Sequence, residues 1–479
     1  MIQLPPGHGR GRHVSERISM TTTHLSVTQR LARWASDLQG SAIPDTVRAL
    51  AKTSLIDTIG VSIAGSRTRV GGIARETGLQ AGSRGWSTLF GCTTRVSEQT
   101  AAFVNGASAH ALDFDDNCYA GVVHGSAVIA PAALAVGQKV NACGKDLITA
   151  FVAGSECEYA VGAASKNILY EQGWWTTGVL GPIGACVAAS HLLKLDPEKM
   201  SSALGLAITG AGGTKACFGT DGKALMAGRA AEAGVACALL AAQGARGPLD
   251  AVESTNGFAR LFNEGVFDLA AMDGLGSRWF SQEPGVDIKR IPVCLSSHAA
   301  VDALMNLVAT HNIRLDDIES IVCNVPPMVA RNLVYNQPET IQQSQFSMQY
   351  AIAVSLKFGS FTLAHLDEKL LNDRELASLM ARVQMCTGPL WDDAELRQSA
   401  PEGAEVHLRL RDGKVLQFFR ATARGSVGSP LSREEIGDKF LACATPTIGS
   451  DPAASLLSRL DALDGEILLR EIFEKQTAS

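Results

Sequence analysis

The stretch Thr100-Ala-Ala-Phe-Val-Asn-Gly-Ala-Ser-Ala-His110-Ala-Leu-Asp113-Phe-Asp115-Asp116-Asn117 joins an apolar, alanine-rich segment to three carboxylates within four residues. Alanine and other small residues at this density favour helices that pack closely against one another. Carboxylates are costly to bury unless they are paired, ligated or catalytic. The stretch therefore predicts a buried helix of a mainly helical domain, with a reactive group of side chains at its end.

Length and composition limit the possible architectures and partners. The 479 residues exceed what one ordinary core accommodates, so we expect two domains. Hydrophobic residues make up 46% and charged residues 19%, which is typical of a folded protein with much buried surface. The net charge of −6 indicates no nucleic-acid partner. We find no run of about 18 apolar residues, so we also expect no membrane partner.

Cysteine usage and the first residues bear on location. The 11 cysteines are scattered, and none forms a C-x-x-C pair. This pattern is typical of buried thiols in a reducing compartment, so we expect a cytoplasmic protein. Residues 1–25 are polar and lack the apolar core of a secretory signal. We expect a disordered tail there, with a mitochondrial transit peptide as the alternative.

The periodicity of the chain changes twice. From Ser26 to about Gly265 the spacing of apolar residues is helical, and Asp196-Pro197-Glu198 has the residues of a helix start. Further on, the alternating stretches 405–411 and 414–419 flank Asp412-Gly413, which predicts a hairpin with a type I′ turn. Ser432-Arg-Glu-Glu435 is a capping box and predicts a return to helix.

These changes predict a mainly α fold of two domains. We expect a large all-helical domain built from both chain ends, residues 26–284 and 426–479. A smaller α/β lid domain, residues 285–425, is expected as an insertion in it. A cleft between two domains is a common place for a small-molecule site.

Asp113, Asp115, Asp116 and His124 are the first candidates for chemistry. Like charges at close range raise the pKa of one carboxyl, so that one holds a proton while another stays ionised. A histidine nearby exchanges protons near neutral pH. The pattern therefore favours acid–base catalysis.

Three other interpretations of the carboxylates remain open. Asp-x-Asp-Asp is a ligand pattern for a hard cation such as Mg²⁺. It also matches the acid motif of class II terpene cyclases, although aromatic residues, at 6%, are few for a cation-stabilising cavity. Finally, one or more of the aspartates caps a helix or binds loop amides.

Two basic segments are candidates for anion binding. Lys223 opens a long helix of small residues, whose N-terminus and ammonium group together attract a carboxylate; the alternative is a solvated surface lysine. Lys289 precedes a predicted helix start at Ser296, Ser297 and His298, where hydroxyls and free amides bind carboxylate oxygens. A neutral His298 is expected there, and simple packing is the alternative for it.

Aromatic residues supply weaker signals. Trp174 and Trp175 precede an apolar helix, and adjacent tryptophans are costly to expose, so they line a cavity or an interface. Tyr335 is a further candidate for a place in the cleft.

In combination these segments resemble the MmgE/PrpD family, which includes 2-methylcitrate dehydratases, cis-aconitate decarboxylases and an iminodisuccinate epimerase. The resemblance covers residues from about 26 to 445. It is carried by five segments: Leu112-Asp113-Phe-Asp-Asp116 with His124-Gly-Ser, Gly181 to Ser190 with Leu195-Asp196, Lys223 to Ala231, Lys289 to Asp302, and Phe346 to Tyr350.

The resemblance implies roles for individual residues. Asp113 and His124 match the acid–base aspartate and histidine, and Lys223 and Lys289 match lysines that hold substrate carboxylates. Asn117 falls where a threonine often contacts substrate. His298 lies in the matching pocket segment. The family also implies a homodimer and no metal or organic cofactor.

Two departures from the family bear on the reaction. Lyases of the family usually carry a histidine where Trp175 stands, and often another at Met226. Loss of two polar groups leaves substrate carboxylates unpaired or requires a different substrate. We therefore expect a cofactor-independent lyase, a dehydratase or decarboxylase acting next to a carboxylate of a small di- or tricarboxylic acid. An epimerase of a small dicarboxylate is the first alternative, and a non-catalytic binder of a small acid is the second.

Overall fold

The structure is a computed structural model that describes residues 25–81 and 84–474. The disordered tail expected for residues 1–25 lies almost entirely outside these ranges. Helices dominate the described chain, which confirms the predicted mainly α fold class.

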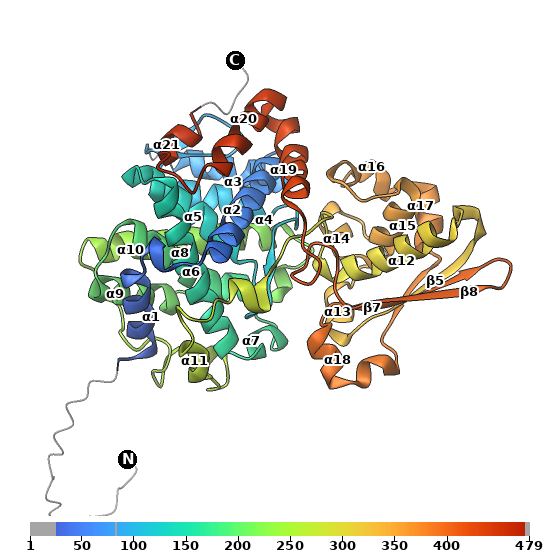
Figure 1. Ribbon diagram of the computed structural model, residues 1–479, viewed down its shortest axis with the longest axis horizontal. Coiled ribbons are helices and arrows are strands. Elements are labelled where there is room, and N and C mark those ends of the chain that lie inside the picture. The colour runs from blue at the N-terminus through green and yellow to red at the C-terminus, as the bar shows by residue number, and fades with distance from the viewer. Residues whose placement is uncertain (1–24, 82–83, 475–479) are drawn as a thin grey trace, which may run out of the picture.

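The larger of two hydrophobic cores is built from both ends of the chain. It joins α1 (Val27–Asp37) and α2 (Asp45–Gly65) to α19 (Arg433–Ile448) and α20 (Ser450–Asp461). In Figure 1 these N-terminal and C-terminal helices, blue and red, lie together on the left-hand side. The capping box predicted at the start of α19 is present, with Ser432 accepting from the Glu435 amide.

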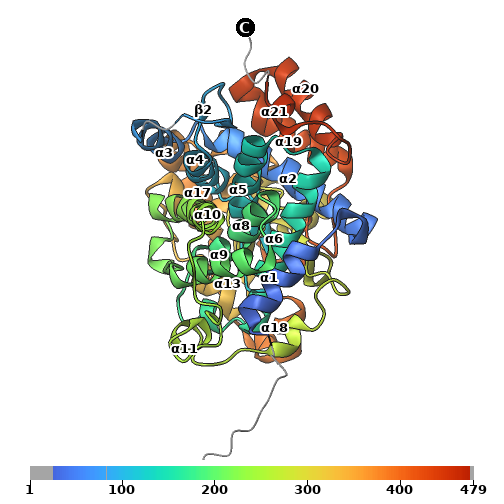
Figure 2. The same ribbon diagram turned by 90° about the vertical axis from the view of Figure 1, so that its left-hand side faces the viewer.

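Small residues let the central helices of this domain approach closely. The central helices are α4 (Glu98–His110), α5 (Gly125–Val140), α6 (Gly144–Ala164), α8 (Thr176–Leu192), α9 (Pro197–Thr209) and α10 (Asp221–Ala242). A Cβ atom at Gly228 of α10 would lie 2.3 Å from the Phe103 carbonyl oxygen of α4. Figure 2 shows α5, α8 and α10 side by side, and α10 packs against both α4 and α8. This packing brings the first turn of α10 towards the end of α4.

By length and composition, α10 is the one helix of the described chain that resembles a membrane span, and its apolar window is 50% buried in the protein. Its packing between α4 and α8 is typical of a core helix.

The smaller core belongs to a second, α/β domain, for which we keep the name lid domain. Its four-stranded sheet has the order β6-β5-β7-β8, with β5 and β6 parallel and the other pairs antiparallel. Two helices, α12 and α15, pack against it. The elements are β5 (Ile318–Asn324), β6 (Val383–Cys386), β7 (Ala404–Leu410), β8 (Val415–Arg420), α12 (His298–His311) and α15 (Met348–Phe358). In Figure 1 this domain lies to the right of the helical domain.

Shorter elements complete the two domains. In the helical domain these are α3 (Arg69–Gln80), α7 (Ile168–Glu171), α11 (Phe258–Phe262), α21 (Leu469–Ile472), β1 (Ser87–Thr88), β2 (Arg95–Val96), β3 (Asn117–Cys118) and β4 (Val286–Asp287). In the lid they are α13 (Pro327–Asn332), α14 (Ile341–Ser344), α16 (Glu368–Leu371), α17 (Arg374–Met380) and α18 (Ala394–Ser399).

The predicted hairpin forms, but the predicted turn type is wrong. The Leu410 amide donates to the Lys414 carbonyl at 2.8 Å, so the loop holds three residues, 411–413. Gly413 has a φ of +89°, whereas a type I′ turn also needs a positive φ at Asp412. A three-residue loop with glycine in the left-handed position also fits the right-handed twist of the strands.

Candidate active site

Asp113 lies at the centre of a buried cluster of charges. Its Oδ1 is 2.5 Å from the Nζ of Lys289 and 3.2 Å from the Nζ of Lys223. Lys289 also donates to the Asp113 carbonyl oxygen at 2.9 Å. The exposed side-chain fractions are 3% for Asp113, 8% for Lys223 and 0% for Lys289. The structure thus brings together one carboxylate and two cations that are far apart in the sequence.

Two local features position this cluster. The chain turns sharply after α4, where Asp113 adopts a left-handed φ of +46°, a conformation that L-residues other than asparagine and aspartate rarely adopt. Shortly afterwards β3 pairs with β4, with Asn117 opposite Asp287. Since Lys289 follows Asp287 by two residues, this pairing brings the acidic loop and Lys289 to the same place.

The electrostatics of the cluster favour the ionised forms. Burial alone would raise the pKa of Asp113, but the charges of Lys223 and Lys289 outweigh it and hold that pKa well below the usual range. Burial would lower the pKa of Lys289, but Asp113 and Asp115 outweigh it and raise this pKa. Asp113 is therefore a carboxylate at neutral pH and a weak base in this state.

His124 lies beside the cluster with a defined tautomer. Its Nδ1 is 2.8 Å from the Asp116 carbonyl oxygen. Because a carbonyl only accepts, Nδ1 carries the proton and Nε2 carries the lone pair. Burial lowers the pKa of His124 well below its usual value, although the Asp115 carboxylate opposes this shift. His124 is therefore neutral, and its Nε2 can accept a proton.

His110 is a site residue to which the sequence analysis assigned no role. Its Nδ1 lies 2.7 Å from Asp115 Oδ2, and its ring centroid is 4.7 Å from that of His124. Its Nε2 is buried and has no hydrogen-bond partner among the described residues. Burial would raise the pKa of Asp115, but His110 and His124 outweigh it and lower this pKa. The signal in the sequence is a histidine in the last turn of an apolar helix that ends in carboxylates.

Asp116 differs from the other two aspartates. It accepts a hydrogen bond from Ser126, in the first turn of α5, and burial raises its pKa to about 7. The expectation that one carboxyl holds a proton while its neighbours stay ionised thus describes Asp116 against Asp113 and Asp115. Asp116 thus connects the loop to α5 through a serine hydroxyl, whereas the structural role expected for at least one of the three was to cap a helix or bind loop amides.

Other predicted residues surround the cluster at different distances. Lys223 lies 5.3 Å from the ring centroid of Phe218, whose carbonyl accepts from the Tyr335 hydroxyl at 3.4 Å. Met226 follows Lys223 by one helical turn and packs against the larger core. Trp175 is 1% exposed, and its ring centroid is 5.5 Å from that of His110. Tyr335 and Trp175 thus lie beside residues that adjoin the charged cluster.

The residues of the predicted helix start, Ser296, Ser297 and His298, form no hydrogen bond with Asp113 or the two lysines in the described part of the chain. They form hydrogen bonds with other protein groups. Ser296 donates to Glu402 at 2.7 Å, Ser297 donates to the Cys294 carbonyl at 2.9 Å, and His298 Nε2 lies 3.2 Å from the Val293 carbonyl. Burial lowers the pKa of His298 well below its usual value, in keeping with the neutral form expected for it. In the described state these hydroxyls are committed to the protein.

A buried chain of hydrogen bonds joins the lid to the helical domain here. Glu402 of the lid accepts from the Tyr119 hydroxyl at 2.6 Å as well as from Ser296. The Asn332 side chain donates to Ser296 at 3.1 Å and accepts from the Tyr170 hydroxyl at 2.7 Å. Tyr119 lies in the acid–base loop, so this chain connects that loop to the segment that follows Lys289.

The donor atoms also resemble a metal site. Ligand atoms of His110, Asp113, Asp115 and His124 lie within 4.8 Å of one another. However, the ammonium groups of Lys223 and Lys289 contact Asp113 and already supply two positive charges there. The arrangement is better suited to hold an anionic substrate against the lysines, next to a neutral histidine.

Sequence comparisons relate the chain to known proteins. The sequence profile of the MmgE/PrpD N-terminal domain matches residues 29–269, and that of the MmgE/PrpD C-terminal domain matches residues 291–464. Cis-aconitate decarboxylase of Mus musculus is 27% identical over 452 residues, 92% of this chain and 91% of that protein. The Homo sapiens enzyme is also 27% identical, over 92% of both chains. Cis-aconitate decarboxylase-like protein oryM of Aspergillus oryzae is 26% identical over 95% of this chain and 96% of its own.

Proposed function

The chain belongs to the MmgE/PrpD family, and we propose that it is a cofactor-independent lyase acting next to a carboxylate of a small di- or tricarboxylic acid. Its relatives named cis-aconitate decarboxylase support a lyase of the decarboxylase or dehydratase type. Among these two reactions we place decarboxylation first, because the matched relatives carry that name over nearly their whole length.

The single observation that carries this proposal is the buried contact of two lysines with one carboxylate beside a neutral histidine. A substrate carboxylate has the same charge and geometry as the Asp113 side chain. It can therefore make the contacts with Lys223 and Lys289 that Asp113 makes in the structure. The two ammonium groups then lie where negative charge develops when CO₂ or an α-proton leaves.

His124 is the proton carrier of the proposal. In the structure it is neutral, with its lone pair on Nε2. A bound polyanion raises the pKa of a nearby imidazole, so substrate binding favours the protonated form. His124 then donates a proton to the carbon that loses CO₂. In a dehydration it removes the α-proton instead, while hydroxide leaves from the β-carbon.

Trp175 determines the character of the pocket in this proposal. It is buried against His110 and stands where lyases of the family usually carry a histidine. An indole offers one N–H donor and a large apolar surface, so it holds fewer carboxylate oxygens than the residues it replaces. We therefore expect a substrate with fewer polar groups than methylcitrate on that side.

Proton NMR in D₂O tests the reaction directly. We expect cis-aconitate to lose CO₂ and to gain one deuterium at carbon, and a His124→Gln variant to be at least about 100-fold slower. His311, exposed at the end of α12, provides a control, and His311→Gln should match the wild type. If neither cis-aconitate nor 2-methylcitrate is consumed, the lyase proposal fails. Deuterium exchange without net conversion, or inversion at a carbon, would favour the epimerase, and binding without either would favour the binder.

We also propose a homodimer formed through the outer face of α10. One side of this helix carries apolar residues at helical spacing that are partly or fully exposed: Ala233, Ala236, Cys237 and Leu240. An exposed apolar stripe on a core helix is typical of a protein interface. Light scattering after size exclusion should give twice the chain mass of 50.4 kDa, and Ala236→Arg should reduce it towards one chain. A wild-type monomer at micromolar concentration would contradict this.

A further inference from the structure

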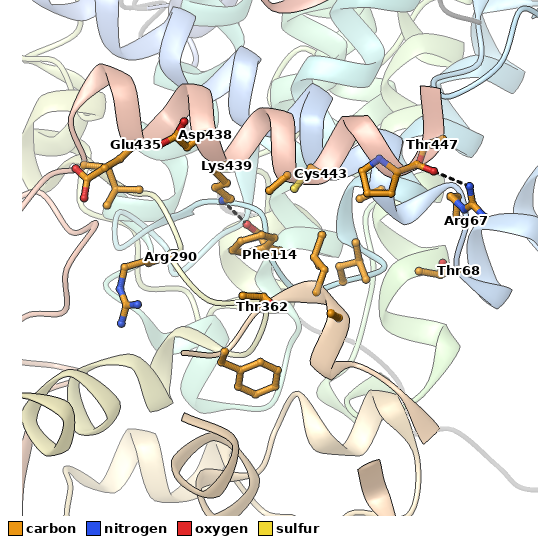
Figure 3. A pocket seen from close by; sticks show the side chains of 18 residues that line it. Arg67, Thr68, Phe114, Arg290, Thr362, Glu435, Asp438, Lys439, Cys443 and Thr447 are labelled. Carbon is orange, nitrogen blue, oxygen red and sulfur yellow. Dashed lines mark hydrogen bonds between the residues drawn. The ribbon is translucent and has the colours of Figure 1, made fainter. Parts of the chain in front are cut away.

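A cavity that is separate from the charged cluster lies between the two domains. It has a volume of about 800 Å³ and is bordered by α19, the end of α2 and the lid segment 361–364. Figure 3 shows that Glu435, Asp438, Lys439 and Cys443 point into it from one face of α19. We call this the α19 groove.

The floor of the α19 groove is apolar. Leu112, Phe114 and Cys443, with Val61, form a small hydrophobic cluster of their own, outside both domain cores, and Leu363 packs against it. The exposed fraction is 7% or less for Leu112, Phe114 and Cys443. An apolar surface of this kind fits a hydrocarbon chain and fits a polyanionic acid poorly.

Charge differs between the two ends of the groove. Arg67 is exposed and donates to the Pro446 carbonyl at 2.8 Å, and its guanidinium forms no ion pair with a carboxylate among the described residues. Asp438 lies two turns before Pro446 on α19 and has no ion-pair partner among the described residues, and Figure 3 shows it away from Arg67. The other two charged side chains at that end are neutralised, Glu435 by Arg424 and Arg290 by Asp302. Eight residues of α-helix span about 12 Å. The groove therefore has an arginine without a carboxylate partner near one end and the unpaired Asp438 carboxylate towards the other, which favours one anionic group in the ligand over two.

The groove shares a wall with the candidate active site. Leu112 and Phe114 border the groove, whereas Asp113 between them faces the two lysines. Arg290 likewise borders the groove, whereas the neighbouring Lys289 contacts Asp113. Alternate residues of the same two segments thus face two different spaces.

We propose that the α19 groove binds a small amphiphilic monocarboxylate. Its carboxylate pairs with Arg67, and its hydrocarbon chain covers Leu112, Phe114, Leu363 and Cys443. Extension towards the unpaired Asp438 carboxylate disfavours a dicarboxylate of similar length. This ligand class differs from that of the proposed substrate, and the site does not depend on the proposed reaction.

Octanoate is a suitable probe, because its chain has about the length of the groove. Titration calorimetry with the full chain should give a Kd of about 0.1 to 1 mM for a ligand of about ten non-hydrogen atoms. Octan-1-ol lacks the charge and octanedioate adds a second one, so both should bind at least about tenfold more weakly. Cis-aconitate should not displace octanoate.

Three variants locate the binding. Arg67→Gln should weaken octanoate binding about tenfold or more, and Ala442→Phe should block it by filling the groove. Arg433→Gln, on the same helix but paired with Asp461 outside the groove, should bind like the wild type. The proposal is overturned if wild-type protein does not bind octanoate, if Arg67→Gln binds unchanged, or if octan-1-ol binds equally well. Thermal unfolding of each variant confirms that it is folded.

Discussion

Removal of Lys289 tests the charged cluster most sharply. Two unit charges 2.5 Å apart attract each other by about 6–7 kcal/mol at an effective dielectric constant of about 20, before the desolvation of both ions is subtracted. In a Lys289→Met variant Asp113 keeps Lys223 at 3.2 Å but remains buried with half of its compensation. Breaking a buried pair in this way typically costs about 3–5 kcal/mol of unfolding free energy.

Urea unfolding at neutral pH measures this cost. Asp113→Asn alone leaves two buried lysines without this carboxylate, whereas the double variant with Lys289→Met leaves only Lys223, so the double variant should lose less than the sum of the two single losses. Lys145→Met provides the control, because Lys145 pairs with Glu466 at the surface, and its stability should equal that of the wild type within error. The reasoning is refuted if Lys289→Met is as stable as the wild type, or if the two substitutions in the cluster are additive.

Three further predictions follow from the buried groups. His124→Gln should lower kcat about 100-fold or more and leave KM within a few-fold in steady-state assays, and a loss of less than tenfold would contradict its role as proton carrier. Burial raises the pKa of Glu158 to about 8, above the value of an unfolded glutamate. The protonated Glu158 side chain therefore contributes fully to the unfolding free energy below about pH 4.5, and this contribution is lost as the pH rises through 8. Urea midpoints between pH 5 and 9 should therefore fall less steeply in Glu158→Gln than in the wild type, and identical slopes would contradict this. Glu402→Ala leaves two buried hydroxyl donors, Tyr119 and Ser296, without an acceptor and should lower the unfolding free energy by about 1–3 kcal/mol. Glu402→Gln should lose less, and equal losses would contradict the role of these hydrogen bonds in joining the two domains.

Features that depend on neighbouring residues were predictable from the sequence. The cap at Asp196 and the capping box at Ser432 are satisfied by amides three residues later, so their signals are local. The hairpin strands were predictable for the same reason. The turn type was not, because Asp412-Gly413 occurs in loops of two and of three residues, and cross-strand packing selects between them.

The residues of the charged cluster were predictable from the sequence, but the contacts among them were not. The sequence analysis placed Asp113, His124, Lys223 and Lys289 at one reaction centre, and the structure brings these segments together. The contact of both lysines with Asp113 depends on the β3–β4 pairing and on the left-handed turn at Asp113, neither of which a linear pattern encodes. The role of His110 depends on the same turn, because it brings Asp115 back to the helix end.

The pairing of Asp113 with both lysines has a consequence for selectivity. Asp113 competes with anionic ligands for the two lysines. Because it belongs to the same chain, this rival is present at a high and constant effective concentration. A ligand with one carboxylate gains at most the two lysine contacts that Asp113 gives up, and it leaves the buried aspartate without a counter-charge. A ligand with two or three carboxylates meets both ammonium groups at once and overcomes this rival. Discrimination between monoacids and polyacids is thus present before any substrate arrives.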